Sequence, residues 1–165
     1  MSIRNELKSW LGGCRRLVIL GVGNPLRGDD SLGLEILERI RGRVPRNVKL
    51  IYGGTVPENF IGKVGRLRPS HVLIIDAALF GGKPGEARLI PPEQIPDTTI
   101  STHTMPLNLL VSLIQKKTNA KVILLGIEPK NLGLGEEISR EVKKSVERCA
   151  VALIEAIGGA VQRKH

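Results

Sequence analysis

Residues 21–33, with the sequence GVGNPLRGDDSLG, form a glycine-rich turn that directly follows an apolar run at residues 17–20. Apolar residues at helical spacing come next, so the segment predicts a strand, a sharp turn and a helix. At such junctions the N–H groups of the helix start usually bind a phosphate. Here the helix start carries Asp29 and Asp30, whose charges are favoured by the helix dipole but would repel a pyrophosphate. The turn therefore favours a cation.

Two other interpretations of this turn remain open. A dinucleotide site would need a small third residue in its G-x-G-x-x-G fingerprint, and Leu26 stands at that position. A purely structural turn would use Asp29 or Asp30 as a helix N-cap. Capping accounts for only one of the two carboxylates, so the second is available for chemistry.

The length and composition of the chain predict a single domain. The chain has 165 residues, of which 41% are hydrophobic, and this is enough for a substantial core. We expect a helical extension at residues 1–14, a core at 15–160 and a basic tail at 161–165. No apolar run has the length of a signal or membrane segment, so we expect a cytoplasmic protein without membrane insertion. Cys14 and Cys149 are far apart and lack metal-binding spacing, and Cys149 falls on the apolar stripe of a predicted helix.

The formal charge of +9 raises the question of a polyanionic partner. The basic residues are spread along the chain, mostly on the predicted solvent faces of helices. One Trp, one Tyr and two Phe are too few for single-strand stacking platforms, so no nucleic acid is expected. The charge favours either a solvated surface or an acidic protein partner.

Strand-like and helix-like segments alternate along the chain. We expect strands at about 16–22, 48–52, 71–75, 86–90 and 121–127, and helices at about 3–11, 30–42, 57–66, 105–117 and 138–157. The strand at 86–90 is short and is followed by two prolines, which is typical of a sheet edge. The pattern predicts an α/β three-layer sandwich. Its twisted sheet is mostly parallel, has helices on both faces and includes one short antiparallel edge strand.

Right-handed crossovers place all strand-to-helix loops at the carboxyl edge of such a sheet. Asp30 follows the first strand, Asp76 ends the third and His103 precedes a helix, so all three should face one crevice. Singly, Asp76 could cap a turn and His103 could be a surface residue. Together they form a ligand set for a divalent transition metal with open coordination positions. An aspartic dyad of the two acids is conceivable, but a histidine beside it would compete. We expect His71 and His165 at the surface.

Five segments together resemble the [NiFe]-hydrogenase maturation proteases, over about residues 16–158. They are G-x-G-N-x-L-x-x-D-D-x-x-G at 21–33, G-G-T at 53–55, I-I-D-A at 74–77, S-T-H at 101–103 and G-I-E-P at 126–129. The resemblance implies an endopeptidase that removes the C-terminal extension of a hydrogenase large-subunit precursor after nickel insertion. It also implies cleavage after a basic residue just beyond the last cysteine motif of the substrate.

The resemblance also implies roles for particular residues. Asp30, Asp76 and His103 match the family's nickel-contacting positions, the first of which is glutamate in some members. We take these three as both metal-contacting and catalytic residues, with the nickel carried by the substrate and no tightly bound metal of the protein's own. Asn24 and the loop formed by Gly53, Gly54 and Thr55 are expected to contact the substrate. With Asp76 pointing into the crevice, Asp76→Asn should spare the fold but stop processing, whereas Asp29→Asn should be mild.

Three rival functions follow from the same residues. A peptidyl-tRNA hydrolase shares the strand and G-x-G-N-P opening, but it places a histidine and an asparagine where this chain has residues 29–31. A nickel-binding accessory protein without protease activity would use the same ligands. A zinc hydrolase would hold its metal tightly. Ser31, Ser101 and Thr104 lack a suitably spaced second histidine, and neither cysteine lies in a candidate turn, so a covalent nucleophile is not predicted.

Overall fold

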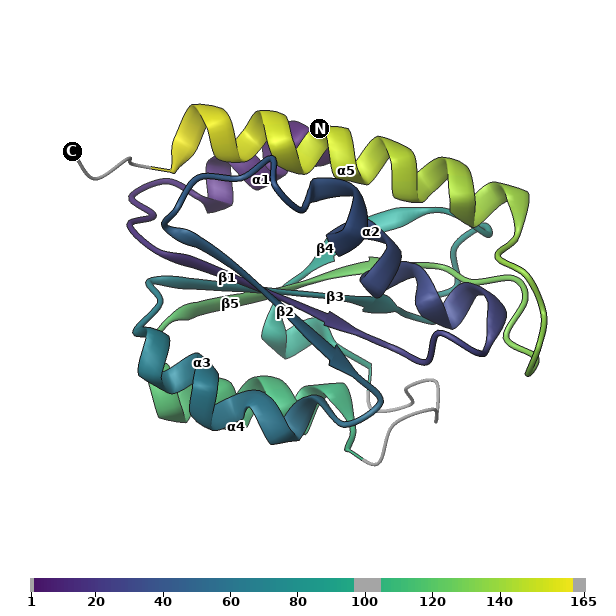
Figure 1. Ribbon diagram of the computed structural model, residues 1–165, viewed down its shortest axis with the longest axis horizontal. Coiled ribbons are helices and arrows are strands. Elements are labelled where there is room, and N and C mark those ends of the chain that lie inside the picture. The colour runs from purple at the N-terminus through teal and green to yellow at the C-terminus, as the bar shows by residue number, and fades with distance from the viewer. Residues whose placement is uncertain (1, 97–104, 162–165) are drawn as a thin grey trace.

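The computed structural model describes residues 2–96 and 105–161, and a five-stranded sheet forms the centre of this part (Figure 1). The strands are β1 (Leu17–Val22), β2 (Val48–Gly54), β3 (His71–Ala77), β4 (Ala87–Ile90) and β5 (Lys121–Ile127). Their order is β2-β1-β3-β5-β4, with β4 antiparallel to β5 and all other pairs parallel. The expected α/β class and the antiparallel edge strand are confirmed.

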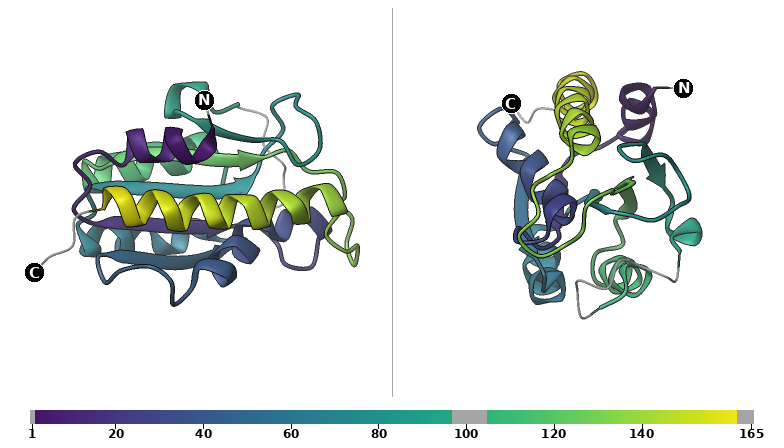
Figure 2. Two further views of the ribbon diagram at one scale, coloured as in Figure 1. Left: turned by 90° about the horizontal axis from the view of Figure 1, so that it is seen from above. Right: turned by 90° about the vertical axis from the view of Figure 1, so that its right-hand side faces the viewer.

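Helices cover both faces of the sheet, as the views in Figures 1 and 2 show. One face carries α1 (Ile3–Trp10), α2 (Leu32–Ile40) and α5 (Arg140–Ala160), and the other carries α3 (Ile61–Leu67) and α4 (Leu107–Thr118). Short 3-10 helices, η1 (Gly28–Ser31), η2 (Pro57–Phe60) and η3 (Pro92–Gln94), lie in the connections. In the described part of the chain, no helix combines the length and hydropathy that a bilayer crossing requires.

The apolar runs at β1 and β3 are buried on both faces, which explains their lack of polar alternation. Leu17 and Ile19 belong to the core under α2 and α5, while Val18 and Leu20 belong to the core over α3 and α4. A fully buried side chain of this kind contributes about 1.5–3 kcal/mol to stability. The two central strands therefore anchor both layers and fix the position of the loops at their ends.

The C-terminal helix is longer than the sequence pattern suggests. Gly158 and Gly159 do not stop α5, which continues to Ala160. Each glycine costs about 1 kcal/mol relative to alanine in a helix. The apolar contacts on both sides of the pair offset this cost, because Ile157 and Val161 are both buried in the same core.

His71 is buried, so the expectation of a surface residue is wrong; His165 lies outside the described residues. The His71 side chain is only 3% exposed. Its ring packs edge-on against Trp10 of α1 with centroids 5.0 Å apart, and its Nδ1 lies 2.9 Å from Ser70 Oγ. Burial, reinforced by the charge of Lys121, lowers the pKa of His71 below its ordinary value of 6.5.

This lowered pKa predicts a loss of stability in mild acid. Below about pH 6.5 the unfolded chain binds a proton at His71 while the folded chain does not. The free energy of unfolding should therefore fall as the pH drops from 6.5 to the pKa of the folded state, by at most about 1.4 kcal/mol per pH unit. Urea unfolding at pH 7.5 and 5.5 should show a larger loss for the wild type than for His71→Gln. Equal losses would contradict the prediction.

Candidate active site

The acidic turn is held in place by a backbone contact that only glycine permits. Gly23 has φ +138°, and a side chain there would collide with the backbone oxygen of Asp30. Asp30 lies in η1 with 0% exposure, and its Oδ2 accepts a hydrogen bond of 2.8 Å from the backbone N–H of Asn24. The side chain of Asp30 thus stabilises the turn by binding the backbone of Asn24, six residues earlier in the chain.

A second glycine brings this turn onto the neighbouring strand. A Cβ at Gly33 would collide with the carbonyl oxygen of Ile75 and lie 2.7 Å from that of Val22. The start of α2 therefore packs directly against the ends of β1 and β3, which are adjacent parallel strands. Asp76 follows Ile75 on β3, so both predicted aspartates lie at the carboxyl edge of the sheet, as expected.

Asp76 is more buried than its expected position in a crevice suggested. Its side chain is 1% exposed, and Oδ1 accepts a hydrogen bond of 2.8 Å from the N–H of Ala77. This local bond fixes the carboxylate at the strand end.

The third predicted ligand, His103, lies outside the described residues. Within residues 2–96 and 105–161, no group of three or more His, Cys, Asp or Glu side chains is arranged to hold a metal ion. Asp30 and Asp76 supply carboxylate oxygens, which suit a divalent metal when a nitrogen ligand completes the set.

The predicted substrate-contacting residues lie beside the acidic turn. The N–H of Gly23 donates to the carbonyl of Gly54 over 2.9 Å, and the pairing of β1 with β2 becomes irregular at this point. This contact places the loop formed by Gly53, Gly54 and Thr55 next to Asn24. The structure therefore brings these four residues to the edge that carries Asp30 and Asp76.

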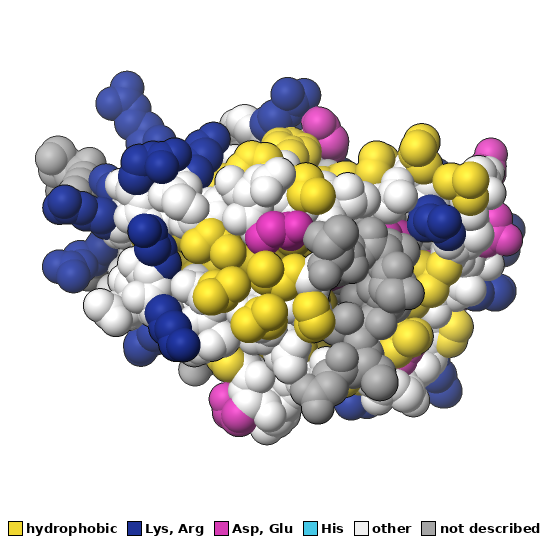
Figure 3. All heavy atoms as spheres, turned by 90° about the horizontal axis from the view of Figure 1, so that it is seen from below, with side chains coloured by type: hydrophobic (Ala, Val, Ile, Leu, Met, Phe, Trp, Pro, Cys, Tyr) yellow, Lys and Arg dark blue, Asp and Glu magenta, His cyan; other side chains and the backbone are white. Residues whose placement is uncertain are grey.

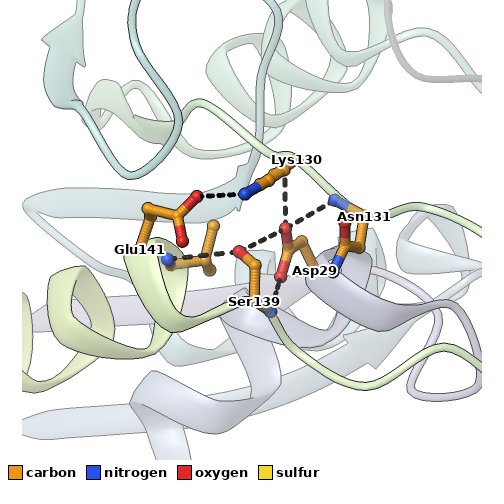
Figure 4. A network of polar contacts seen from close by, with 6 residues as sticks. Asp29, Lys130, Asn131, Ser139 and Glu141 are labelled. Carbon is orange, nitrogen blue, oxygen red and sulfur yellow. Dashed lines mark hydrogen bonds and ion pairs between the residues drawn. The ribbon is translucent and has the colours of Figure 1, made fainter.

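Asp29 has a role that the sequence did not reveal. It is 0% exposed, and neither Asp29 nor Asp30 is an N-cap of the helix that follows. Asp29 Oδ2 accepts hydrogen bonds of 2.8 Å from the N–H groups of Lys130 and Asn131 and from Ser139 Oγ (Figure 4). Its Oδ1 accepts a bond of 2.6 Å from the Ser139 N–H. The carboxylate thus holds the β5–α5 connection against η1.

Further bonds extend the Asp29 network to the start of α5. Ser139 is the N-cap of α5, since its Oγ accepts from the N–H of Val142 over 3.3 Å. Lys130 Nζ forms an ion pair of 2.8 Å with Glu141, and this contact lowers the pKa of Glu141 (Figure 4). The same network therefore orders both ends of the β5–α5 connection.

Glu128, in the G-I-E-P segment, fixes another loop at this edge. It is 5% exposed, and its Oε1 accepts hydrogen bonds from the N–H groups of Phe80 (3.1 Å) and Gly82 (2.6 Å). These bonds hold the loop that follows Asp76 on β3. The sequence could have identified Glu128, because an acid at the end of a buried strand is the same pattern that identified Asp76.

The two cysteines take no part in this edge. Cys14 and Cys149 are both buried and free, and the core position expected for Cys149 is confirmed. Burial raises the pKa of each thiol, which keeps both in the unreactive protonated form at neutral pH.

Comparisons with known proteins assign the chain to a family. The profile of the family described as "Hydrogenase maturation protease" matches residues 12–156. The hydrogenase 3 maturation protease of Escherichia coli strain K12 is 39% identical over 131 residues, which cover 79% of this chain and 83% of that protein.

Solved structures of related proteases share the fold. A [NiFe] hydrogenase maturation protease from Thermococcus kodakarensis aligns with a TM-score of 0.85 and 34% identity, over 93% of this chain and 99% of that one. An endopeptidase from Escherichia coli, solved in solution, aligns with a TM-score of 0.75 and 36% identity, over 89% and 96%. This chain therefore belongs to the hydrogenase maturation protease family and is an endopeptidase.

Proposed function

We propose that this endopeptidase removes the C-terminal extension from the precursor of a [NiFe]-hydrogenase large subunit, after nickel has been inserted into that precursor. The observation that carries the proposal is the pair Asp30 and Asp76, two buried carboxylates held at one sheet edge by adjacent parallel strands. The family of the chain supports the substrate class. A cytoplasmic location stays a prediction.

In this proposal the nickel is part of the substrate. Asp30, Asp76 and His103 contact it, and the scissile peptide is thereby positioned beside them. The hydrogen bonds from Asn24 to Asp30 and from Ala77 to Asp76 hold both carboxylates in fixed orientations before the substrate arrives. Bound nickel would orient the peptide and polarise its carbonyl or a water molecule.

The neighbouring loop would contact the polypeptide on either side of the metal. Asn24 and the loop at residues 53–55 lie beside the acidic turn, and the backbone contact between Gly23 and Gly54 holds them together. We assign the substrate-binding role to these residues because they lie at the same sheet edge as the two carboxylates.

An aspartic dyad is the competing mechanism, because it would use Asp30 and Asp76 without nickel. Incubation with nickel-loaded and nickel-free precursor separates the two, with product mass as the readout. We expect only the nickel-loaded precursor to lose its C-terminal extension. Equal processing of both precursors would contradict nickel recognition while leaving the peptidase activity in place.

The purified enzyme provides a second readout. If nickel belongs to the substrate, elemental analysis of the enzyme should find no stoichiometric metal. Stoichiometric zinc retained through purification would support a zinc hydrolase instead. Unchanged precursor mass under both nickel conditions would contradict the proposed cleavage itself.

A further inference from the structure

A cationic cleft lies at the end of the molecule opposite the candidate active site. It is a cavity of about 910 Å³ at the amino ends of β1 and β2, between the α2–β2 turn and the last turns of α5. Its cationic lining residues are Arg16, Arg43, Arg46 and Lys49. Figure 3 shows Lys and Arg side chains gathered at this end of the molecule.

The positive charge of the cleft is not neutralised by the described part of the protein. No acidic residue lines it, and Arg43, Arg46 and Lys49 form no ion pair with any described residue. Nearby arginines behave differently, since Arg39 pairs with Glu147 at 3.6 Å and Arg41 with Glu38 at 3.2 Å. Like charges gathered in a concave surface repel one another, and an anionic ligand would relieve that repulsion.

Arg16, which also lines the cleft, is held by a hydrogen bond. Its guanidinium Nη1 donates a hydrogen bond of 2.6 Å to the carbonyl of Leu67, and the residue is half-buried. Arg16 also lines a second cavity of about 340 Å³, together with Arg15, Arg68, Pro69 and Ser70. Because the two cavities share Arg16, the cationic lining continues from the cleft along the amino edge of the sheet.

The cleft also has an apolar wall, which narrows the class of ligand. Val44, Pro45 and Ile154, which are half-buried, contribute hydrocarbon surface beside the cationic side chains. A small inorganic anion would leave this wall unused. A single-stranded nucleic acid would need aromatic platforms, and neither cavity has an aromatic lining residue. Carboxylates match the planar fork of arginine, and an aliphatic side chain would cover the apolar wall.

We propose that the cationic cleft docks an acidic peptide segment of a partner protein, one that carries several carboxylates and at least one aliphatic side chain. The cleft is at the opposite sheet edge from Asp30 and Asp76, so docking does not depend on the nickel contacts. A partner bound there would leave the carboxyl edge accessible to the precursor.

Fluorescence anisotropy with a labelled synthetic peptide of alternating glutamate and leucine tests the proposal at about 0.15 M salt. The variant Arg43→Glu with Arg46→Glu should weaken binding by about tenfold or more. The matched control is Lys143→Glu with Lys144→Glu, which makes the same change in net charge on exposed positions of α5. It should weaken binding by less than about threefold, because it lies outside the cleft.

Val44→Ser separates peptide docking from simple anion binding. This variant should weaken the binding of the glutamate and leucine peptide. It should leave the binding of inorganic tripolyphosphate unchanged, since tripolyphosphate has no apolar part. Thermal melting of every variant checks the fold.

Three outcomes would overturn the proposal. The first is that the charge reversals at Lys143 and Lys144 weaken peptide binding as much as those at Arg43 and Arg46. The second is that a peptide of alternating glutamine and leucine binds as tightly as the peptide of alternating glutamate and leucine. The third is tighter binding of tripolyphosphate or single-stranded DNA than of the acidic peptide.

Discussion

Asp76→Asn should abolish precursor processing while the protein stays folded. The substitution keeps the size of the side chain, and the amide oxygen can still accept the 2.8 Å hydrogen bond from Ala77. It removes the negative charge that a divalent metal requires, so we expect processing of nickel-loaded precursor to slow by about a hundredfold or more. Asp76 is 1% exposed, and loss of a buried charge also removes its desolvation cost. The free energy of unfolding should therefore change by less than about 1 kcal/mol.

Glu35→Gln is the matched control for this experiment. Glu35 is an exposed acid on α2, the helix that follows Asp30, and its amide variant should process precursor at the wild-type rate. Product mass over time gives the rate, and thermal melting gives the stability. Processing by Asp76→Asn at the wild-type rate would show that the metal contact lies in another loop.

The positions of Asp30 and Asp76 followed from the sequence because they depend on general rules. Apolar runs that alternate with helices predict a parallel sheet, and parallel strands bring their carboxyl ends to one edge. The edge strand β4 was equally predictable, since Pro91 and Pro92 cannot continue a central strand. These features need only local pattern and handedness.

The role of Asp29 was not predictable in the same way. Its partner Ser139 lies 110 positions further along the chain, and nothing in the local pattern links the two residues. The burial of His71 likewise depends on α1, whose Trp10 covers the ring from a distant part of the sequence. The extension of α5 through Gly158 depends on the burial of Val161. Each miss is a case in which tertiary packing overrides local preference.

The Asp29 network predicts a large effect of Asp29→Asn on stability, whereas the expected mild effect on processing stays a prediction. Both carboxylate oxygens accept hydrogen bonds, three at Oδ2 and one at Oδ1. An asparagine can present only one oxygen to these donors. If that oxygen faces Lys130 and Asn131, the amide nitrogen faces the N–H of Ser139, and two donors then oppose each other. In the flipped orientation the amide nitrogen opposes two N–H donors, those of Lys130 and Asn131, instead of one.

A buried donor left without an acceptor costs about 1–3 kcal/mol, and bonds to a charged acceptor are stronger than neutral ones. We therefore expect Asp29→Asn to lower the free energy of unfolding by about 2–4 kcal/mol. For a chain of this size the melting temperature should fall by about 5–15 °C. Glu137→Gln, an exposed acid in the same β5–α5 connection, should change it by less than about 2 °C.

A double-mutant cycle with Ser139→Ala assigns the loss to this network. Ser139 gives Asp29 both its N–H and its hydroxyl. The alanine variant keeps the N–H bond, but it removes the hydroxyl bond of 2.8 Å to Asp29 and the N-cap bond from Val142, and the cycle subtracts the N-cap loss because that loss is present in both Ser139 variants. If Asp29 acts through this contact, the double variant should be less destabilised than the sum of the single variants, by about 0.5–3 kcal/mol. Strict additivity would show that the two side chains act independently. A melting temperature for Asp29→Asn within about 2 °C of the wild type would show that the β5–α5 connection does not depend on this carboxylate.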